Sequence, residues 1–393
     1  MKNTVVVTGL GMSTSIGKGV LENWQSMVEG KSNFKRSRRL CDKSIRTSFA
    51  AVDDRFEDQR NPRVIVETYI KEVVREASAD AGGGAFDRMY YSLPTSVYYW
   101  HERLNDQLAS PPSARNVLEE FSSEEGLSAY FFETYGLTQY PAVISTACAS
   151  SATAIQLGYE AIVRGHAKRV LVAAADSPIY DETVTKFNNL SALSTRNDSP
   201  ATACRPFSQT RDGFVIGEGG GCIVLEREDA AQQRGAQIYA YLSGCGNTTD
   251  NVHRTKGDPS GSGIKECVLK AIDQAGLTPS AISCVNAHGT STPENDRMEA
   301  KIIGELLGER ALVTSVKSLI GHTLNAAGVI EAVVSVLSLK HQIVTPTLNY
   351  DSSLVDDGVT IVSASLHNAN IDNVISNSFG FGGQNVSIVF TRA

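Results

Sequence analysis

One of the seven cysteines and two of the seven histidines stand where their neighbours favour chemistry. Cys148 follows a short apolar stretch, residues 141–144, that predicts a buried strand, and a small-residue helix pattern then extends to about Arg164. This pattern places Cys148 in a strand-to-helix turn beside a helix N-terminus, where partial positive charge stabilises a thiolate over a thiol. His288 and His322 lie in similarly small and polar surroundings. A cysteine nucleophile with two imidazoles indicates acyl-thioester chemistry.

Each of these three residues also has a structural alternative. A small buried thiol is the usual role of a cysteine, and it fits most of the other six. Cys148, however, has small neighbours that leave room for an acyl group, and its backbone N–H at a helix start is a free donor for a carbonyl oxygen. His288 alone suits a core histidine, and His322 alone suits a helix cap. Together they supply two imidazole N–H groups for a negatively charged oxygen, which favours the catalytic interpretation.

Three further residues are candidates for supporting roles. Lys317 ends an apolar strand five residues before His322, and Glu299 is a possible charge partner in a helical segment. A surface position is the alternative for the lysine. Phe381 lies between glycines, which suits either a core plug or a gate. The glycines at 217–221 are no phosphate loop, because neither Gly-Lys-Ser nor Gly-Lys-Thr follows, and they indicate a tight turn or close packing.

The elements that must hold these residues alternate along the chain. Strands are expected at residues 5–10, 169–175, 213–225, 237–245, 282–287, 312–316, 374–378 and 385–391. Helices are expected near residues 20–28 and at 63–81, 263–276, 295–307 and 326–341. This alternation predicts an α/β architecture with buried sheets. The halves echo each other weakly, since residues 143–148 and 282–292 each bring a reactive residue into a polar turn, and residues 244–259 form the expected internal boundary.

The composition is that of an ordinary globular chain and excludes several classes of protein. A chain of 393 residues with 41% hydrophobic content can bury a large core. The net charge of −7 argues against general affinity for nucleic acids, and no segment approaches the ~20 apolar residues of a membrane span. The N-terminal residues predict a first strand rather than a signal peptide, and cysteines without a Cys-x-x-Cys pair fit reduced thiols in the cytoplasm. A basic run at residues 31–43 is expected to be mainly a solvated loop.

Nine stretches of the sequence together resemble one family. They are Val6-Val-Thr-Gly-Leu-Gly11, Thr146-Ala-Cys-Ala-Ser150, Leu190-Ser-Ala-Leu-Ser194, Cys204-Arg-Pro-Phe207, Arg211-Asp-Gly-Phe-Val-Ile-Gly-Glu-Gly219, Asn286-Ala-His-Gly-Thr-Ser-Thr-Pro293, Ser315-Val-Lys-Ser318, Gly321-His322 and Asn377-Ser-Phe-Gly-Phe-Gly-Gly383. In this order and spacing they resemble the β-ketoacyl-acyl-carrier-protein synthases of the thiolase superfamily, and above all the elongating KAS I/II type. The likeness spans nearly the whole chain.

The resemblance implies a five-layered αβαβα fold of two similar halves. We expect residues 1–245 to form the half with the nucleophile and residues 246–393 to form the half with the two histidines. Acyl carrier protein is the implied partner, and its phosphopantetheine arm carries the substrates, so that no cofactor or metal is implied. A cytoplasmic homodimer is expected, with a heterodimer with a paralogue as the alternative.

The family's functional residues map onto matching positions of this sequence. Cys148 matches the acylated nucleophile. His288 and His322 match the pair that assists malonyl decarboxylation and stabilises the enolate. Lys317 and Glu299 match the charged pair that supports the site. These assignments rest on the resemblance and on the motifs that carry it.

The remaining matches concern the substrate and its pocket. Phe381 matches the gating phenylalanine, and its backbone N–H, with that of Cys148, matches the oxyanion hole. Thr290 and Thr292 match the threonines that contact the pantetheine arm. Residues 90–101 depart from the Gly-rich stretch that lines the acyl pocket in relatives. The acyl-chain specificity therefore stays open between housekeeping fatty-acid synthesis and a specialised lipid or polyketide pathway.

The implied activity is that of a 3-oxoacyl-acyl-carrier-protein synthase, an acyltransferase that performs decarboxylative Claisen condensation with malonyl-ACP. A degradative thiolase would need a second, C-terminal cysteine, whereas the last cysteine here is Cys284. A starter synthase would carry Asn in place of His322. A papain-like protease would need sequence contexts that are absent. A chain-length factor keeps the fold but loses the nucleophile, which this chain retains as Cys148.

Overall fold

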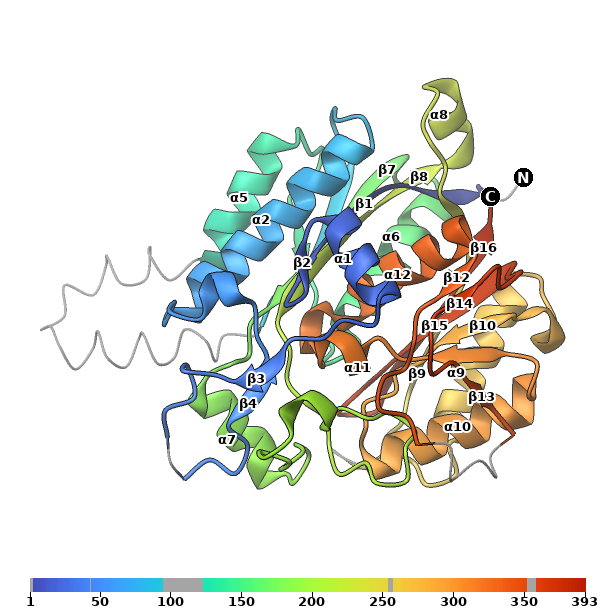
Figure 1. The fold of residues 1–393 in the computed structure, drawn as a ribbon. Coiled ribbons are helices and arrows are strands. Elements are labelled where there is room, and N and C mark those ends of the chain that lie inside the picture. The colour runs from blue at the N-terminus through green and yellow to red at the C-terminus, as the bar shows by residue number, and fades with distance from the viewer. Residues whose placement is uncertain (1–2, 43, 95–122, 254–256, 352–357) are drawn as a thin grey trace, which may run out of the picture.

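Two sets of strands with the same order and the same directions form the centre of the molecule (Figure 1). The computed structural model describes residues 3–42, 44–94, 123–253, 257–351 and 358–393. The first set runs outward from the centre as β1 (Val5–Thr14), β8 (Gly219–Arg227), β7 (Arg169–Asp176), β5 (Arg88–Ser92) and β6 (Ala142–Val143). The second set runs outward as β9 (Ala240–Thr249), β16 (Gln384–Arg392), β15 (Asn373–Gly380), β10 (Cys284–Asn286) and β11 (Leu312–Thr314).

The pairing within the two sets is also the same. In each set the first three strands are antiparallel, and the outer strands continue parallel to the third. The sets meet between β1 and β9 through only two residue pairs, Val6 with Tyr241 and Val7 with Ala240. This repeated order confirms the fold of two similar halves. The predicted division into 1–245 and 246–393 falls within β9 and stays a prediction.

Helices separate and cover the two sets of strands. The inner layer is formed by α6 (Ser150–Val163) and α12 (Ala327–His341), which contact each other and strands of both sets. One outer layer is formed by α2 (Pro62–Asp80) and α5 (Ser123–Thr134), and the other by α9 (Ser262–Gln274) and α10 (Pro293–Leu307). In Figure 1, α6 and α12 lie centrally, with α2 and α5 on one outer side and α9 and α10 on the other. The arrangement is the expected αβαβα succession.

The sequence patterns of the helices follow from these layers. In α2, the apolar residues Val66, Ile70, Val73 and Ala77 recur at helical spacing because one face of the helix packs on a sheet. In α12, all residues from 327 to 339 are buried, because both sides of that helix face protein. Residues Leu324–His341 are apolar enough to cross a membrane by composition, but 83% of this stretch is buried inside the fold. It is therefore a core helix here.

Shorter elements complete the part of the chain that the structure describes. They are β2 (Gly17–Lys18), α1 (Val20–Val28), β3 (Phe34–Arg36), β4 (Phe49–Ala51), η1 (Asp54–Phe56), α7 (Asp181–Asn189), η2 (Pro200–Thr202), α8 (Glu228–Gln233), η3 (Pro279–Ala281), α11 (Lys317–Ile320), η4 (Leu324–Ala326), β12 (Ile343–Val344), β13 (Thr360–Ile361) and β14 (Leu366–His367). Among them, α7 and α11 carry Phe187 and Lys317, which belong to the candidate site described below.

Four expectations about local structure were wrong in detail. The strand before Cys148 is only the two residues of β6, and Val143 is 37% exposed because β6 ends the sheet. β8 begins at residue 219, not 213. Lys317 begins α11 instead of ending a strand, and the short helix η4 separates His322 from α12. Of the divergent segment 90–101, residues 95–101 lie outside the described residues.

Candidate active site

A cavity of about 560 Å³ collects most of the predicted site residues. Its lining includes Cys148, His288, Thr290, Thr292, His322 and Phe381. Lys317 and Glu299 do not line the cavity and are buried behind it, with 1% and 0% of their surface exposed. The first half of the fold thus supplies the cysteine, and the second half supplies the histidines, the threonines and the phenylalanine.

Cys148 lies two residues before α6, in a tight turn that the preceding residue makes possible. Ala147 has a φ of 50°, a left-handed conformation that turns the chain sharply between β6 and α6. The end of β15 packs directly against this turn. A Cβ at Gly380 would lie 3.3 Å from the backbone nitrogen of Cys148 and 3.1 Å from the carbonyl oxygen of Thr146. A glycine there therefore allows the β15–β16 turn to approach the cysteine closely.

The backbone N–H groups of Phe381 and of Cys148 itself lie beside the sulfur of Cys148 and favour its charged form. These are the two N–H groups predicted to form the oxyanion hole. Burial nevertheless raises the pKa of Cys148 to about 11, although Lys317 and the two N–H groups lower it. The N–H groups at this turn thus favour the thiolate, but the loss of hydration on burial outweighs them.

The two histidine rings meet edge to face with their centroids 5.4 Å apart. Nδ1 of His322 accepts a hydrogen bond from the backbone N–H of Leu324, at 3.3 Å. Nδ1 of His288 lies 3.4 Å from Nζ of Lys317, and an ammonium group can only donate. Both rings are therefore expected in the tautomer that carries its proton on Nε2. Each ring can then donate one hydrogen bond from Nε2, and both histidines line the cavity.

Both imidazoles are held in the neutral form. Burial, followed by the positive charge of Lys317, lowers the pKa of His288 and of His322 well below the usual 6.5. His322 adds a smaller lowering to the pKa of His288. A neutral ring donates one hydrogen bond without bringing a proton that must be removed. The pair is thus suited to stabilise an oxyanion and poorly suited to act as a strong acid.

The expected ion pair between Lys317 and Glu299 is corrected by the structure. Lys317 instead pairs with Glu331 of α12, and both side chains are 2% exposed. Burial raises the pKa of Glu331, and the charge of Lys317 opposes that rise. Sequence reasoning missed Glu331. The available signal was a lone carboxylate in the otherwise apolar segment 326–341.

Glu299 has a different task from the one predicted. Its carboxylate accepts hydrogen bonds from the backbone N–H groups of His288 and Gly289, at 2.9 and 2.8 Å. Asn377 of β15 donates a third bond to it, at 3.2 Å. Burial raises the pKa of Glu299, and these donors lower it. Glu299 therefore fixes the turn that presents the His288 ring.

The remaining predicted residues stand at the cavity wall. The hydroxyls of Thr290 and Thr292 lie 2.9 Å apart and offer donors and acceptors to a polar chain. Phe381 is 37% exposed in the β15–β16 turn, and its ring centroid lies 6.4 Å from that of Phe187 of α7. Among the described residues, no group of His, Cys, Asp and Glu side chains is arranged to hold a metal ion.

Two family models match the chain. The N-terminal domain of β-ketoacyl synthases matches residues 107–231, and the C-terminal domain of β-ketoacyl synthases matches residues 239–351. The chain is 33% identical to 3-oxoacyl-[acyl-carrier-protein] synthase 2 of Coxiella burnetii, over 100% of this chain and 99% of that protein. It is 32% identical to the synthase of the same name from Staphylococcus aureus, over 99% of this chain and 98% of that protein.

Solved structures give the same picture. A β-ketoacyl synthase from Burkholderia phymatum is similar with a TM-score of 0.86 and 30% identity, over 100% of both chains. The type II polyketide ketosynthase AntDE, solved with its acyl-carrier protein and bound to the hexaketide, is similar with a TM-score of 0.90 and 27% identity, also over 100% of both chains. Full-length likeness in sequence and in fold shows that the chain belongs to the β-ketoacyl synthase family.

Proposed function

We propose that this chain is a 3-oxoacyl-[acyl-carrier-protein] synthase, which lengthens an acyl chain by decarboxylative Claisen condensation with malonyl-ACP. The observation that carries the proposal is the convergence of two donor pairs on one cavity. The backbone N–H groups of Cys148 and Phe381 meet at the sulfur, and the neutral rings of His288 and His322 face the same space. Two oxyanion sites beside one thiol suit a condensation, in which one site binds the acyl carbonyl oxygen and the other binds the enolate oxygen of the malonyl unit.

In the first half-reaction, the Cys148 sulfur attacks the thioester carbonyl of acyl-ACP. The carbonyl oxygen becomes an oxyanion and is stabilised by the N–H groups of Cys148 and Phe381. The carrier's thiolate leaves and takes up the proton that the cysteine loses. The acyl group then rests on Cys148, and the free carrier dissociates.

In the second half-reaction, malonyl-ACP loses CO₂, and the bonding pair forms an enolate. The enolate oxygen is stabilised by the Nε2–H groups of His288 and His322. The enolate carbon attacks the acyl carbonyl, and the Cys148 thiolate leaves and is reprotonated from solvent. Decarboxylation itself generates the carbanion, so this scheme requires no general base on carbon, no metal and no nucleotide.

The direct test incubates the protein with a series of acyl-ACPs and then measures the mass of its peptides. The expected result is acylation of Cys148 in the wild type and none in Cys148→Ala. Cys148→Gln should keep malonyl-ACP decarboxylation while losing condensation, because the amide resembles an acylated side chain. Acylation of the Cys148→Ala protein would overturn the assignment. The same series, extended to polyketide chains, separates a fatty-acid from a polyketide preference.

We also propose that the enzyme works as a dimer in the cytoplasm, with a second copy or a paralogue as its partner. The edge strand β6 and the region beside it support the dimer. Tyr130, Phe132, Tyr140 and Val143 are 37–52% exposed there, an unusual cluster of large apolar groups for a free surface. Sedimentation should give twice the mass of the 42.2 kDa chain, and Val143→Arg should reduce it to a monomer.

A further inference from the structure

A buried ion pair lies behind His322, outside the cavity. Arg39 and Glu218 are 4% and 0% exposed, and the guanidinium binds the carboxylate through both of its terminal nitrogens. The hydroxyl of Ser177 and the backbone N–H of Asp53 donate to the same carboxylate, at 2.7 and 2.9 Å. Four donors thus satisfy Glu218 completely. Arg39 belongs to the basic run that was expected to be mainly solvated, so this expectation is wrong for it.

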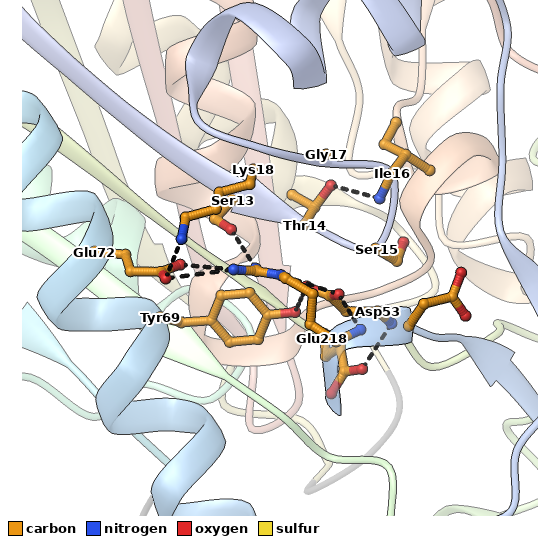
Figure 2. Close-up of polar contacts among 12 residues, drawn as sticks. Ser13, Thr14, Ser15, Ile16, Gly17, Lys18, Asp53, Tyr69, Glu72 and Glu218 are labelled. Carbon is orange, nitrogen blue, oxygen red and sulfur yellow. Dashed lines mark hydrogen bonds and ion pairs between the residues drawn. The ribbon is translucent and has the colours of Figure 1, made fainter. Parts of the chain in front are cut away.

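The Arg39–Glu218 pair is connected through Asp53 to a wider network of hydrogen bonds and ion pairs. Figure 2 shows Glu218 beside Asp53, with Tyr69 of α2 reaching toward them. The Tyr69 hydroxyl donates to the Asp53 carboxylate at 2.8 Å, and Arg55 binds that carboxylate as well. Since these groups come from α2 and from the segment after β4, Glu218 is held from several elements at once.

The residues just before Glu218 connect it to His322 through backbone hydrogen bonds. The backbone N–H of His322 donates to the carbonyl of Val215 at 2.8 Å, and the N–H of Gly217 donates to the carbonyl of His322 at 3.0 Å. On the other side, the N–H of Ala51 in β4 donates to the carbonyl of Ile216 at 2.8 Å. A Cβ at Gly217 would lie 2.0 Å from the carbonyl oxygen of Ile320, so the two backbones are in close contact.

We infer that Arg39 and Glu218 form a positioning pair for His322, an inference that rests on the proposed role of His322 in decarboxylation. The His322 ring takes its orientation from local neighbours, the N–H of Leu324 and the ring of Phe214 at 5.4 Å. A shift of residues 215–217 would therefore move Nε2 relative to the enolate. The pair touches no substrate and acts only through the backbone.

Stability alone is a weak explanation for such a pair. The desolvation of two charges offsets most of their attraction, and apolar replacements of similar volume are often as stable. The double variant Arg39→Met/Glu218→Gln removes both charges and leaves neither one unpaired. The control, Arg169→Met/Glu226→Gln, disrupts a second low-exposure cluster near the other end of β8, in which Glu226 binds both Arg169 and Arg234.

The test measures both half-reactions in both double variants. Malonyl-ACP decarboxylation should fall about 10-fold to 100-fold in Arg39→Met/Glu218→Gln, because misplacement by about 1 Å costs up to that much. Acylation of Cys148 by a small acyl thioester, and the KM for malonyl-ACP, should stay within about 2-fold of the wild type. The control should change neither half-reaction. Equal loss of both half-reactions, or loss of neither, would overturn the inference.

Two further measurements keep the test decisive. Arg39→Lys keeps the charge but loses the two-pronged contact, so it should show a smaller loss confined to decarboxylation, even if the double variant fails to fold. In ¹⁵N-histidine spectra, the ring signals that vanish in His322→Ala should shift in Arg39→Lys, and unshifted signals would contradict the inference. Failure of the proposed function would look different, because His322→Ala would then retain decarboxylation.

Discussion

At the scale of single residues, burial decides how the candidate site can work. It raises the pKa of Cys148 to about 11 and lowers the pKa of His288 and of His322 well below 6.5. At neutral pH the cysteine is therefore a thiol, and both histidines are neutral donors. Acylation must remove the thiol proton as the substrate arrives. The same desolvation that disfavours the thiolate strengthens every hydrogen bond to a developing oxyanion.

This division of labour predicts separate effects on the half-reactions. His288→Ala and His322→Ala should each lower the rate of malonyl-ACP decarboxylation on the order of 10²–10³-fold, because each removes one donor to the enolate. Acylation of Cys148 should fall less, since its oxyanion is bound by backbone N–H groups that remain. Single-turnover acylation and CO₂ release measure the two steps. Equal losses would show that the histidines mainly hold the site together.

At the scale of elements, the sequence predicted most helices and strands but not their partners across the fold. Helical periodicity placed α2 and α9 within a residue or two, because each has one apolar face. β6 was predicted as a buried strand because an apolar run cannot show that it lies at a sheet edge. The Lys317–Glu331 ion pair joins two different helices, α11 and α12. The spacing of the two residues along the chain therefore could not predict that they meet.

That pair yields a prediction about helix packing. Glu331→Ala should lower the free energy of unfolding by about 3–5 kcal/mol, because Lys317 would stay buried without a partner. The double variant Lys317→Met/Glu331→Leu should recover most of this stability. It should still decarboxylate poorly, because Lys317 no longer fixes the tautomer of His288. Urea unfolding measures the first effect, and a double variant no more stable than Glu331→Ala would contradict it.

At the scale of the whole molecule, the repeat explains where the reactive residues come from. β6 and α6 of the first half correspond in order to β11 and α12 of the second. Cys148 follows β6, and His322 follows β11, so the nucleophile and one histidine occupy matching places. The sequence echo had instead matched Cys148 with the turn of His288, which follows β10. Strand order decides such a correspondence, and strand order is invisible in a linear pattern.

Recognition of an acidic carrier protein is also a property of the whole surface, since the chain itself carries a net charge of −7. Arg63 is the second residue of α2, Arg60 lies just before the helix, and Asn61 caps it by accepting from the N–H of Arg63. Reversing both arginines to Glu should raise the KM for acyl-ACP and leave acylation by a small thioester unchanged. The control reverses Lys265 and Lys270 of α9, in the opposite outer layer (Figure 1). Equal effects of the two reversals would exclude this docking site.

The buried histidines also give the whole fold a pH dependence with a definite sign. Their pKa values are lowered by folding, so below about pH 6.5 the unfolded chain binds protons that the folded chain does not. Stability should therefore fall as the pH drops below 6.5, by up to about 1.4 kcal/mol per pH unit for each histidine. Glu331 acts in the opposite sense, because burial raises its pKa and folding favours its protonated form.

A comparison of variants isolates the histidine contribution from that of Glu331. His288→Asn/His322→Asn keeps polar groups in place but removes both titrating rings, while Glu331 stays in both proteins. Urea unfolding between pH 6.5 and 5 should then show a steeper loss of stability in the wild type than in the double variant. Parallel curves would mean that the rings take up protons in the folded state. If the folded protein took up these protons, the histidines would no longer be neutral donors, and the rate of malonyl-ACP decarboxylation should fall over the same pH range. Measurement of CO₂ release checks this independently.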